Sequence, residues 1–130
     1  TKMAVMEIKW GLVPDMAGMV LMKGMIRDDI ARELTYTGRI FDGEEAGRIG
    51  VATKVTADPL AEALKLANQI AGKSPTAIRA AKRLFELQAH ATQHALLEAE
   101  SVEQTALISS PNQVEAVMSN MQKRAAVYAD

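Results

Sequence analysis

The fold is decided by residues 31–55, ARELTYTGRIFDGEEAGRIGVATKV, in which start and stop signals for helices follow one another closely. The spacing predicts a helix over 28–36 that ends at Gly38, because glycine readily takes the left-handed conformation common after helix C-termini. Asp42, followed three residues later by Glu45, forms a capping box that satisfies backbone N–H groups of a first helical turn. The stretch therefore predicts two helices joined by a short connection.

The residues that follow extend this pattern toward the C-terminus. The second helix is expected to run through Arg48 and to stop at Gly50, and residues 51–55 are expected to form a short strand. Everything beyond is predicted to be helical. The helix start signals, each a capping residue with or without a proline after it, are Asp58-Pro59, Ser74-Pro75, Thr92 and Ser110-Pro111.

Toward the N-terminus, the stretch MEIKWGLVPDMAG, residues 6–18, contains two acids that are eight positions apart. Alternation of apolar and polar residues predicts a strand over 6–10, with Glu7 and Trp10 on opposite faces. Pro14 and Asp15 interrupt it. Asp15 is then in place to cap a helix that starts at Met16.

Length and composition limit the class of protein. A chain of 130 residues with a formal charge of −1 is enough for one compact unit, and disorder or electrostatic binding to nucleic acid or anionic membranes is not favoured. There is no cysteine, which excludes thiolate metal sites and fits a cytoplasmic location. No apolar run approaches the roughly 20 residues that span a bilayer. Because the chain begins Thr1-Lys2 and enters a strand-like pattern at once, we interpret it as a piece of a longer protein.

Three stretches, residues 6–18, residues 31–55 and AGKSPTAIRAAKRL (residues 71–84), resemble in order the second half of the crotonase family, the enoyl-CoA hydratases and isomerases. The resemblance implies an α/β fold, mostly α in this chain. Residues 1–57 would form the last turns of a spiral of strand-strand-helix units, and residues 58–130 a helical region used for trimer formation. The first half of the family fold is absent, and with it the oxyanion N–H pair and the first catalytic glutamate.

By this resemblance, Glu7 falls at the position of the second catalytic glutamate. A carboxyl group suits chemistry that moves a proton to or from the carbon beside a thioester carbonyl. Asp15 departs from the common hydratase pattern and resembles the dienoyl-CoA isomerase branch, in which two carboxylates relay a proton. Helix capping is the alternative for Asp15, and the two roles are compatible.

The same resemblance assigns further contacts to the substrate. We expect Trp10, Pro14 and Met16 to contact it, and Lys123, in MQKRAAVY (residues 121–128), to lie near the CoA phosphates as a mobile positive charge. No cofactor is expected, since coenzyme A is part of the substrate.

Two other patterns have an ordinary structural reading. Met16, Met19, Met22 and Met25 recur every third residue, and filling gaps in a core is favoured over forming a wall for an acyl chain. His90 and His94 would share one helical face, but two ligands without a third favour a solvated pair over a metal site.

The resemblance therefore implies the C-terminal half of an enoyl-CoA hydratase/isomerase of fatty-acid metabolism, which transfers a proton or adds water on an enoyl-CoA thioester. The alternatives are a dienoyl-CoA isomerase that uses Glu7 and Asp15, and a helical oligomerisation fragment that is inactive alone. The expected partners are the missing N-terminal half and further copies, in a homotrimer or hexamer. We expect neither nucleic acid nor membrane as a partner.

Overall fold

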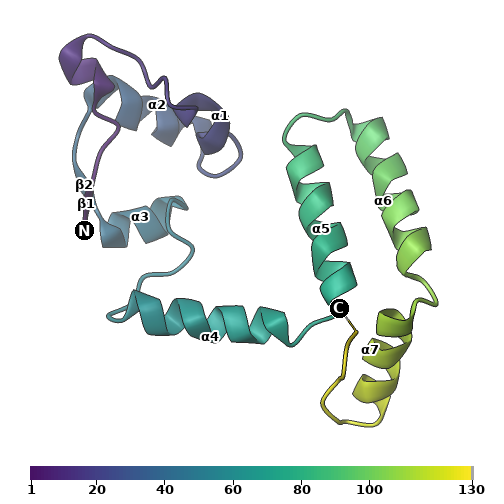
Figure 1. The fold of residues 1–130 in the computed structure, drawn as a ribbon. Coiled ribbons are helices and arrows are strands. Elements are labelled where there is room, and N and C mark those ends of the chain that lie inside the picture. Colours follow the sequence, from purple (N-terminus) through teal and green to yellow (C-terminus); the bar gives the residue numbers. More distant parts are fainter. Residues whose placement is uncertain (130) are drawn as a thin grey trace. The chain divides into compact units, whose positions relative to one another are not determined.

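The computed structural model describes residues 1–129 and divides into two compact units (Figure 1). Unit 1 comprises Thr1–Pro59, and unit 2 begins at Leu60. The roles expected for residues 1–57 and 58–130, a spiral end and a trimerisation region, stay predictions.

Unit 1 is a small mixed unit. It consists of strand β1 (Lys2–Met3), the 3-10 helix η1 (Glu7–Trp10), and helix α1 (Gly18–Met22), followed by helix α2 (Asp28–Thr37), strand β2 (Phe41–Asp42) and helix α3 (Gly43–Ile49). The two strands pair antiparallel, with Lys2 opposite Asp42 and Met3 opposite Phe41. This pairing joins the start of the unit to the connection between α2 and α3 (Figure 1).

The core of unit 1 lies around α2. Leu34 is only 1% exposed, and it packs with Ile26, Phe41 and Ala46. Partly buried apolar residues surround this cluster: Met3, Val5, Met22, Ile30, Ala31, Ile49, Val51 and Ala52. The core therefore combines residues from both ends of unit 1.

The helices that start at residues 28 and 43 are confirmed, and so are their end signals. Gly38 ends α2 with a φ of 58°, and its N–H donates to the Leu34 carbonyl. Asp42 accepts a hydrogen bond from the Glu45 N–H at 2.8 Å, which caps α3. At Gly50, φ is 91° and a Cβ would lie 2.9 Å from the Met25 carbonyl oxygen, so glycine is required there.

The strand expected over 6–10 is wrong, because this stretch forms η1. Gly11 adopts a φ of 70° and donates to the Ile8 carbonyl, while the Leu12 N–H donates to the Glu7 carbonyl. These local bonds close a turn that an extended strand cannot make. The paired residues lie earlier in the chain, at β1.

The strand expected over 51–55 is also wrong. Within residues 1–129 the sheet has only β1 and β2, and neither pairs with this stretch. Instead, the Ala52 N–H donates to the Ala46 carbonyl, and Val51 and Ala52 pack on the core. A β-favouring composition does not make a strand without a partner strand.

Unit 2 is helical, as predicted. Its helices are α4 (Pro59–Ala71), α5 (Pro75–Gln88), α6 (Gln93–Leu107) and α7 (Pro111–Met121); α4 starts at the last residue of unit 1. Thr92 caps α6 by accepting from the Ala95 N–H at 3.2 Å, and Ser110 caps α7 by accepting from Gln113. α5 and α6 lie side by side (Figure 1), joined by an ion pair between Arg83 and Glu103.

Candidate functional site

Glu7 is the first residue of η1 and is half-buried. Its Oε2 atom is shielded from solvent and has no hydrogen-bond partner among residues 1–129. η1 lies against the C-terminal end of α2, where a Cβ at Gly38 would be 3.0 Å from Ile8 Cγ2. A buried polar atom without a partner is unfavourable and uncommon, so it marks a place where a ligand can complete the hydrogen bonding.

The geometry of η1 also corrects the expected orientation of its neighbours. Glu7 and Trp10 are three residues apart, and side chains at this spacing eclipse in a 3-10 helix. They therefore project from the same side of η1, not from opposite faces. Trp10 is 73% exposed, and the Lys9 ammonium lies 6.0 Å from its ring centroid.

Asp15 lies in an exposed turn and does not cap a helix. α1 begins at Gly18, and its N-cap residue is Ala17, whose left-handed φ of 60° interrupts the chain before the helix. The expected helix start at Met16 and the capping role of Asp15 are thus wrong. Within the described part of the chain, the Asp15 carboxylate accepts no hydrogen bond.

The other expected substrate contacts are distributed over both units. Pro14 is half-buried and Met16 is 85% exposed, and both lie with Asp15 in the connection between η1 and α1. Lys123 belongs to unit 2, where it follows α7 with a left-handed φ of 52°. Residues 7–16, which comprise η1 and part of the connection to α1, thus include every expected site residue except Lys123.

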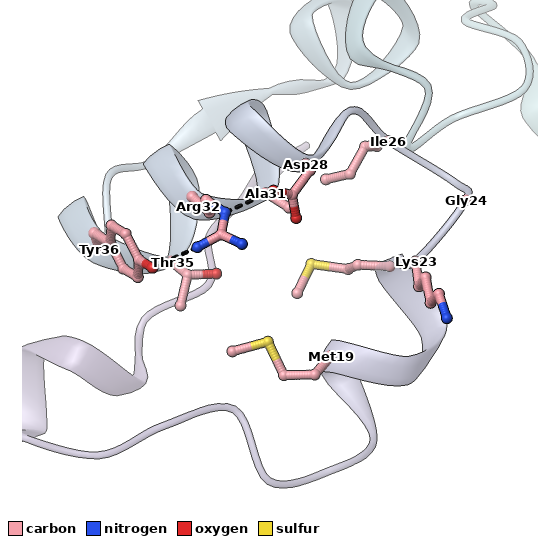
Figure 2. Close-up of a pocket in the computed structure, with 10 residues that line it drawn as sticks. Met19, Lys23, Gly24, Ile26, Asp28, Ala31, Arg32, Thr35 and Tyr36 are labelled. Atoms are coloured by element: carbon pink, nitrogen blue, oxygen red, sulfur yellow. Dashed lines mark hydrogen bonds and ion pairs between the residues drawn. The ribbon is translucent and has the colours of Figure 1, made fainter.

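A pocket of about 400 Å³ lies between α1 and α2 (Figure 2). Its apolar wall includes Met19, Met22 and Ile26. The polar side comes from one face of α2 and contains Asp28, Arg32, Thr35 and Tyr36. Sequence reasoning missed this site; the signal was the spacing of the four polar residues, which places them on one helical face.

The four methionines that recur every third residue lie in two different environments. Met19 and Met22 line the pocket, and Met22 also packs against the core. Met16 and Met25 are exposed, at 85% and 50%. Because α1 spans only Gly18–Met22, the four methionines do not form one helical stripe.

Charged residues connect α2 to α3 beside the core. The Arg39 guanidinium donates to Glu33 Oε1 at 2.7 Å and to Glu45 Oε1 at 2.7 Å. These hydrogen bonds hold the pKa of both glutamates below its usual range. Arg39 thus ties the last turn of α2 to the first turn of α3.

The histidines do not share one helix. His90 lies in the turn after α5, whereas His94 is in α6 and its Nε2 lies 3.3 Å from Glu98 Oε1. Residues 1–129 contain no group of three or more side chains placed to hold a metal ion. In the same range, no helix has the length and apolarity needed to cross a membrane.

The sequence model of the enoyl-CoA hydratase/isomerase family matches residues 1–130, and the chain belongs to this family. Among curated relatives, the carnitinyl-CoA dehydratase of Citrobacter koseri is 34% identical over 84 residues, which are 63% of this chain and 32% of that protein. The carnitinyl-CoA dehydratase of Escherichia coli strain SMS-3-5 is 36% identical over the same shares.

Solved structures show that the fold is crotonase-like. A putative enoyl-CoA hydratase/isomerase from Mycobacterium abscessus superposes with a TM-score of 0.90 at 26% identity, over 98% of this chain and 54% of that one. An enoyl-CoA hydratase from Bacillus anthracis gives 0.87 at 27% identity, over 94% of this chain and 48% of that one. The chain thus spans about a third of these curated relatives and about half of these structures.

Proposed function

We propose that this chain, assembled with the part of the family fold that it lacks, adds water across the double bond of a 2-enoyl-CoA thioester. The observation that supports this function is the shielded, unpartnered Oε2 atom of Glu7 on η1. Carboxylic acids held in water-poor sites are suited to general acid–base catalysis.

In this mechanism, Glu7 handles the proton at the carbon beside the carbonyl. As water adds at C3, its O–H proton passes to the first catalytic glutamate of the complementary half, and an enolate forms whose negative charge rests on the thioester oxygen. The protonated Glu7 carboxyl then donates its proton to C2, and in the reverse direction its carboxylate removes that proton. The enolate oxygen is held by the N–H pair of the complementary half.

The proposal includes further contacts and partners. Trp10, Pro14 and Met16 contact the acyl group, and Lys123 binds the CoA phosphates. No separate cofactor takes part. The assembled enzyme is a cytoplasmic homotrimer or hexamer that acts in fatty-acid metabolism.

A second candidate is dienoyl-CoA isomerisation, and the state of Asp15 favours it. Its carboxylate lies eight residues after Glu7, caps no helix and accepts no hydrogen bond within residues 1–129. Glu7 and Asp15 would then act as base and acid at the two ends of a conjugated system.

The test is a chimera in which residues 1–130 replace the matching part of the Mycobacterium abscessus protein, for which the backbones superpose closely. A folded chimera should hydrate crotonyl-CoA, and Glu7→Gln should reduce kcat about 100-fold or more, the scale of general acid–base catalysis. Glu44→Gln, at an exposed position of α3, is the matched control. Full activity in the Glu7→Gln chimera would contradict the proposal.

Asp15→Asn separates the two candidates. Loss of dienoyl isomerisation with hydration intact assigns the protein to the isomerase branch. The 130-residue chain alone should show negligible hydration, as the third alternative, an oligomerisation fragment, also requires.

A further inference from the structure

The pocket between α1 and α2 holds two polar groups, the Thr35 hydroxyl and Arg32 Nη2, that have no hydrogen-bond partner within residues 1–129. The pocket has a volume of about 400 Å³, and its apolar lining includes Met19, Met22 and Ile26. Pockets of this size, mostly apolar with a few polar groups, are typical of small-molecule sites.

Thr35 is the first of these groups. It is only 9% exposed and lines the pocket, and its hydroxyl makes no hydrogen bond within residues 1–129. A helical threonine commonly donates to the carbonyl four residues before it, as Thr37 does to the Glu33 carbonyl at 2.8 Å. In Figure 2 the Thr35 hydroxyl points into the pocket, so it is available to a ligand.

Arg32 is the second group. Its Nε donates to Asp28 Oδ2 at 2.6 Å, and its Nη1 donates to the Tyr36 hydroxyl at 3.3 Å. These bonds use two of the five N–H donors and hold the guanidinium in place. Nη2 has no partner within residues 1–129, and Figure 2 shows it directed into the pocket.

We propose that this pocket binds a carboxylate at the free end of a short acyl chain, with Arg32 and Thr35 as donors and Met19 and Met22 around the chain. The inference rests on the proposed function only in naming an acyl chain. An arginine held by two bonds with donors to spare recognises carboxylates well. The Asp28 carboxylate on the same side already accepts a hydrogen bond from Arg32, and the Lys23 ammonium points away from the pocket (Figure 2).

The position of the pocket suits such a substrate. Tyr36, at one end of the pocket, lies two residues before Gly38, where α2 contacts η1 and thus the segment that carries Glu7. Arg32 is four residues further back, or about 6 Å along the helix axis. A chain that reacts near Glu7 can therefore present its end to Arg32 after a few carbon atoms.

Binding to the 130-residue chain tests the pocket without catalysis. With methionine methyl groups labelled with carbon-13, adipate should shift the NMR signals of Met19 and Met22 and bind about tenfold more tightly than 1-hexanol, which has no carboxylate to form the charge-assisted hydrogen bond. Arg32→Gln and Thr35→Val should each remove most of this preference. Arg27→Gln is the control, because Arg27 pairs with Asp29 outside the pocket.

Equal binding of adipate and 1-hexanol, or unchanged affinity in both variants, would overturn the proposal. So would shifts confined to Met16 or Met121, which are exposed elsewhere.

The chimera separates this proposal from the proposed function. A six-carbon 2-enoyl-CoA with a terminal carboxylate should have a higher kcat/KM than one with a terminal methyl, and Arg32→Gln should reduce this ratio about tenfold. An active chimera without this preference overturns the pocket assignment, including the case in which the complementary half fills the pocket. If the chimera is inactive but the 130-residue chain alone binds adipate through Arg32, only the proposed function is overturned.

Discussion

The interactions that stabilise unit 1 differ from those that stabilise unit 2. Unit 1 buries Ile26, Leu34, Phe41 and Ala46 in one cluster, whereas Ala80 is the sole buried apolar residue in the described part of unit 2. Unit 2 instead relies on helix caps, on ion pairs and on hydrogen bonds in which the Asn112 amide donates to, and the Glu115 carboxylate accepts from, the segment after α7. Local signals can therefore specify helices in a unit that has almost no buried apolar core.

Apolar side chains remain exposed along the helices of unit 2. They include Leu60, Leu64, Ile70, Phe85, Val114, Val117 and Met121. Such surfaces are typical of faces that contact another polypeptide. The assembly proposed above would supply that contact.

The largest effect should come from the core of unit 1. Leu34→Ala should reduce the free energy of unfolding by about 2–5 kcal/mol, because it removes buried methyl groups and leaves a cavity. Amide hydrogen exchange in α2 and α3 measures the loss. The matched change Leu97→Ala, in a side chain 60% exposed on α6, should change exchange in α6 by less than about 0.5 kcal/mol. Similar losses of stability at Leu34 and Leu97 would contradict the conclusion that a buried core stabilises unit 1 and not unit 2.

The next largest effect should come from Asn112, whose side chain binds the segment after α7 in unit 2. Asn112 is 6% exposed; its Nδ2 donates to the Ala129 carbonyl at 2.8 Å, and its Oδ1 accepts from the Ala129 N–H at 2.9 Å. Asn112→Ala should cost about 1–3 kcal/mol locally. Faster exchange of the Ala129 amide measures it, with Asn120→Ala at an exposed position as control. Unchanged exchange of the Ala129 amide would show that Asn112 does not hold the segment after α7 in place.

Smaller effects should come from the caps, and they should be equal in the two units. Asp42→Ala and Thr92→Ala each remove one side-chain acceptor from a first turn, at a cost of about 1 kcal/mol. Amide exchange of Glu45 and Ala95 measures the two losses. A much larger loss at Asp42 would mean that its cap depends on the core.

The smallest effect should be that of acid on Glu115. Its hydrogen bond with Arg124, and then the one from the Val127 N–H, lower the pKa of Glu115 from 4.5 to about 2. Because the folded form has the lower pKa, the stabilisation is fully present above pH 4.5 and is lost as the pH falls toward 2. The protection factor of the Val127 amide against hydrogen exchange should fall over this range in the native chain. A similar fall in Glu115→Gln would assign the change to another group.

The features predicted well from sequence are those that involve residues close along the chain. The helix end at Gly38 and the caps at Asp42 and Thr92 each depend on groups within about four positions. The features predicted wrongly depend on more distant partners. The alternation over 6–10 is compatible with a strand, but no strand pairs with it, and Gly11 closes a turn instead.

Local signals along the chain specify the helical character of residues 59–121, the capped helix after Asp42 and, through the three matching stretches, the family. The shielding of Glu7 Oε2 and the position of Arg32 and Thr35 at a pocket lined by Met19 and Met22 depend instead on tertiary packing. The reason is physical. A cap or a turn is satisfied by neighbours in the chain, whereas burial and the absence of a hydrogen-bond partner depend on which distant residues the packing brings near.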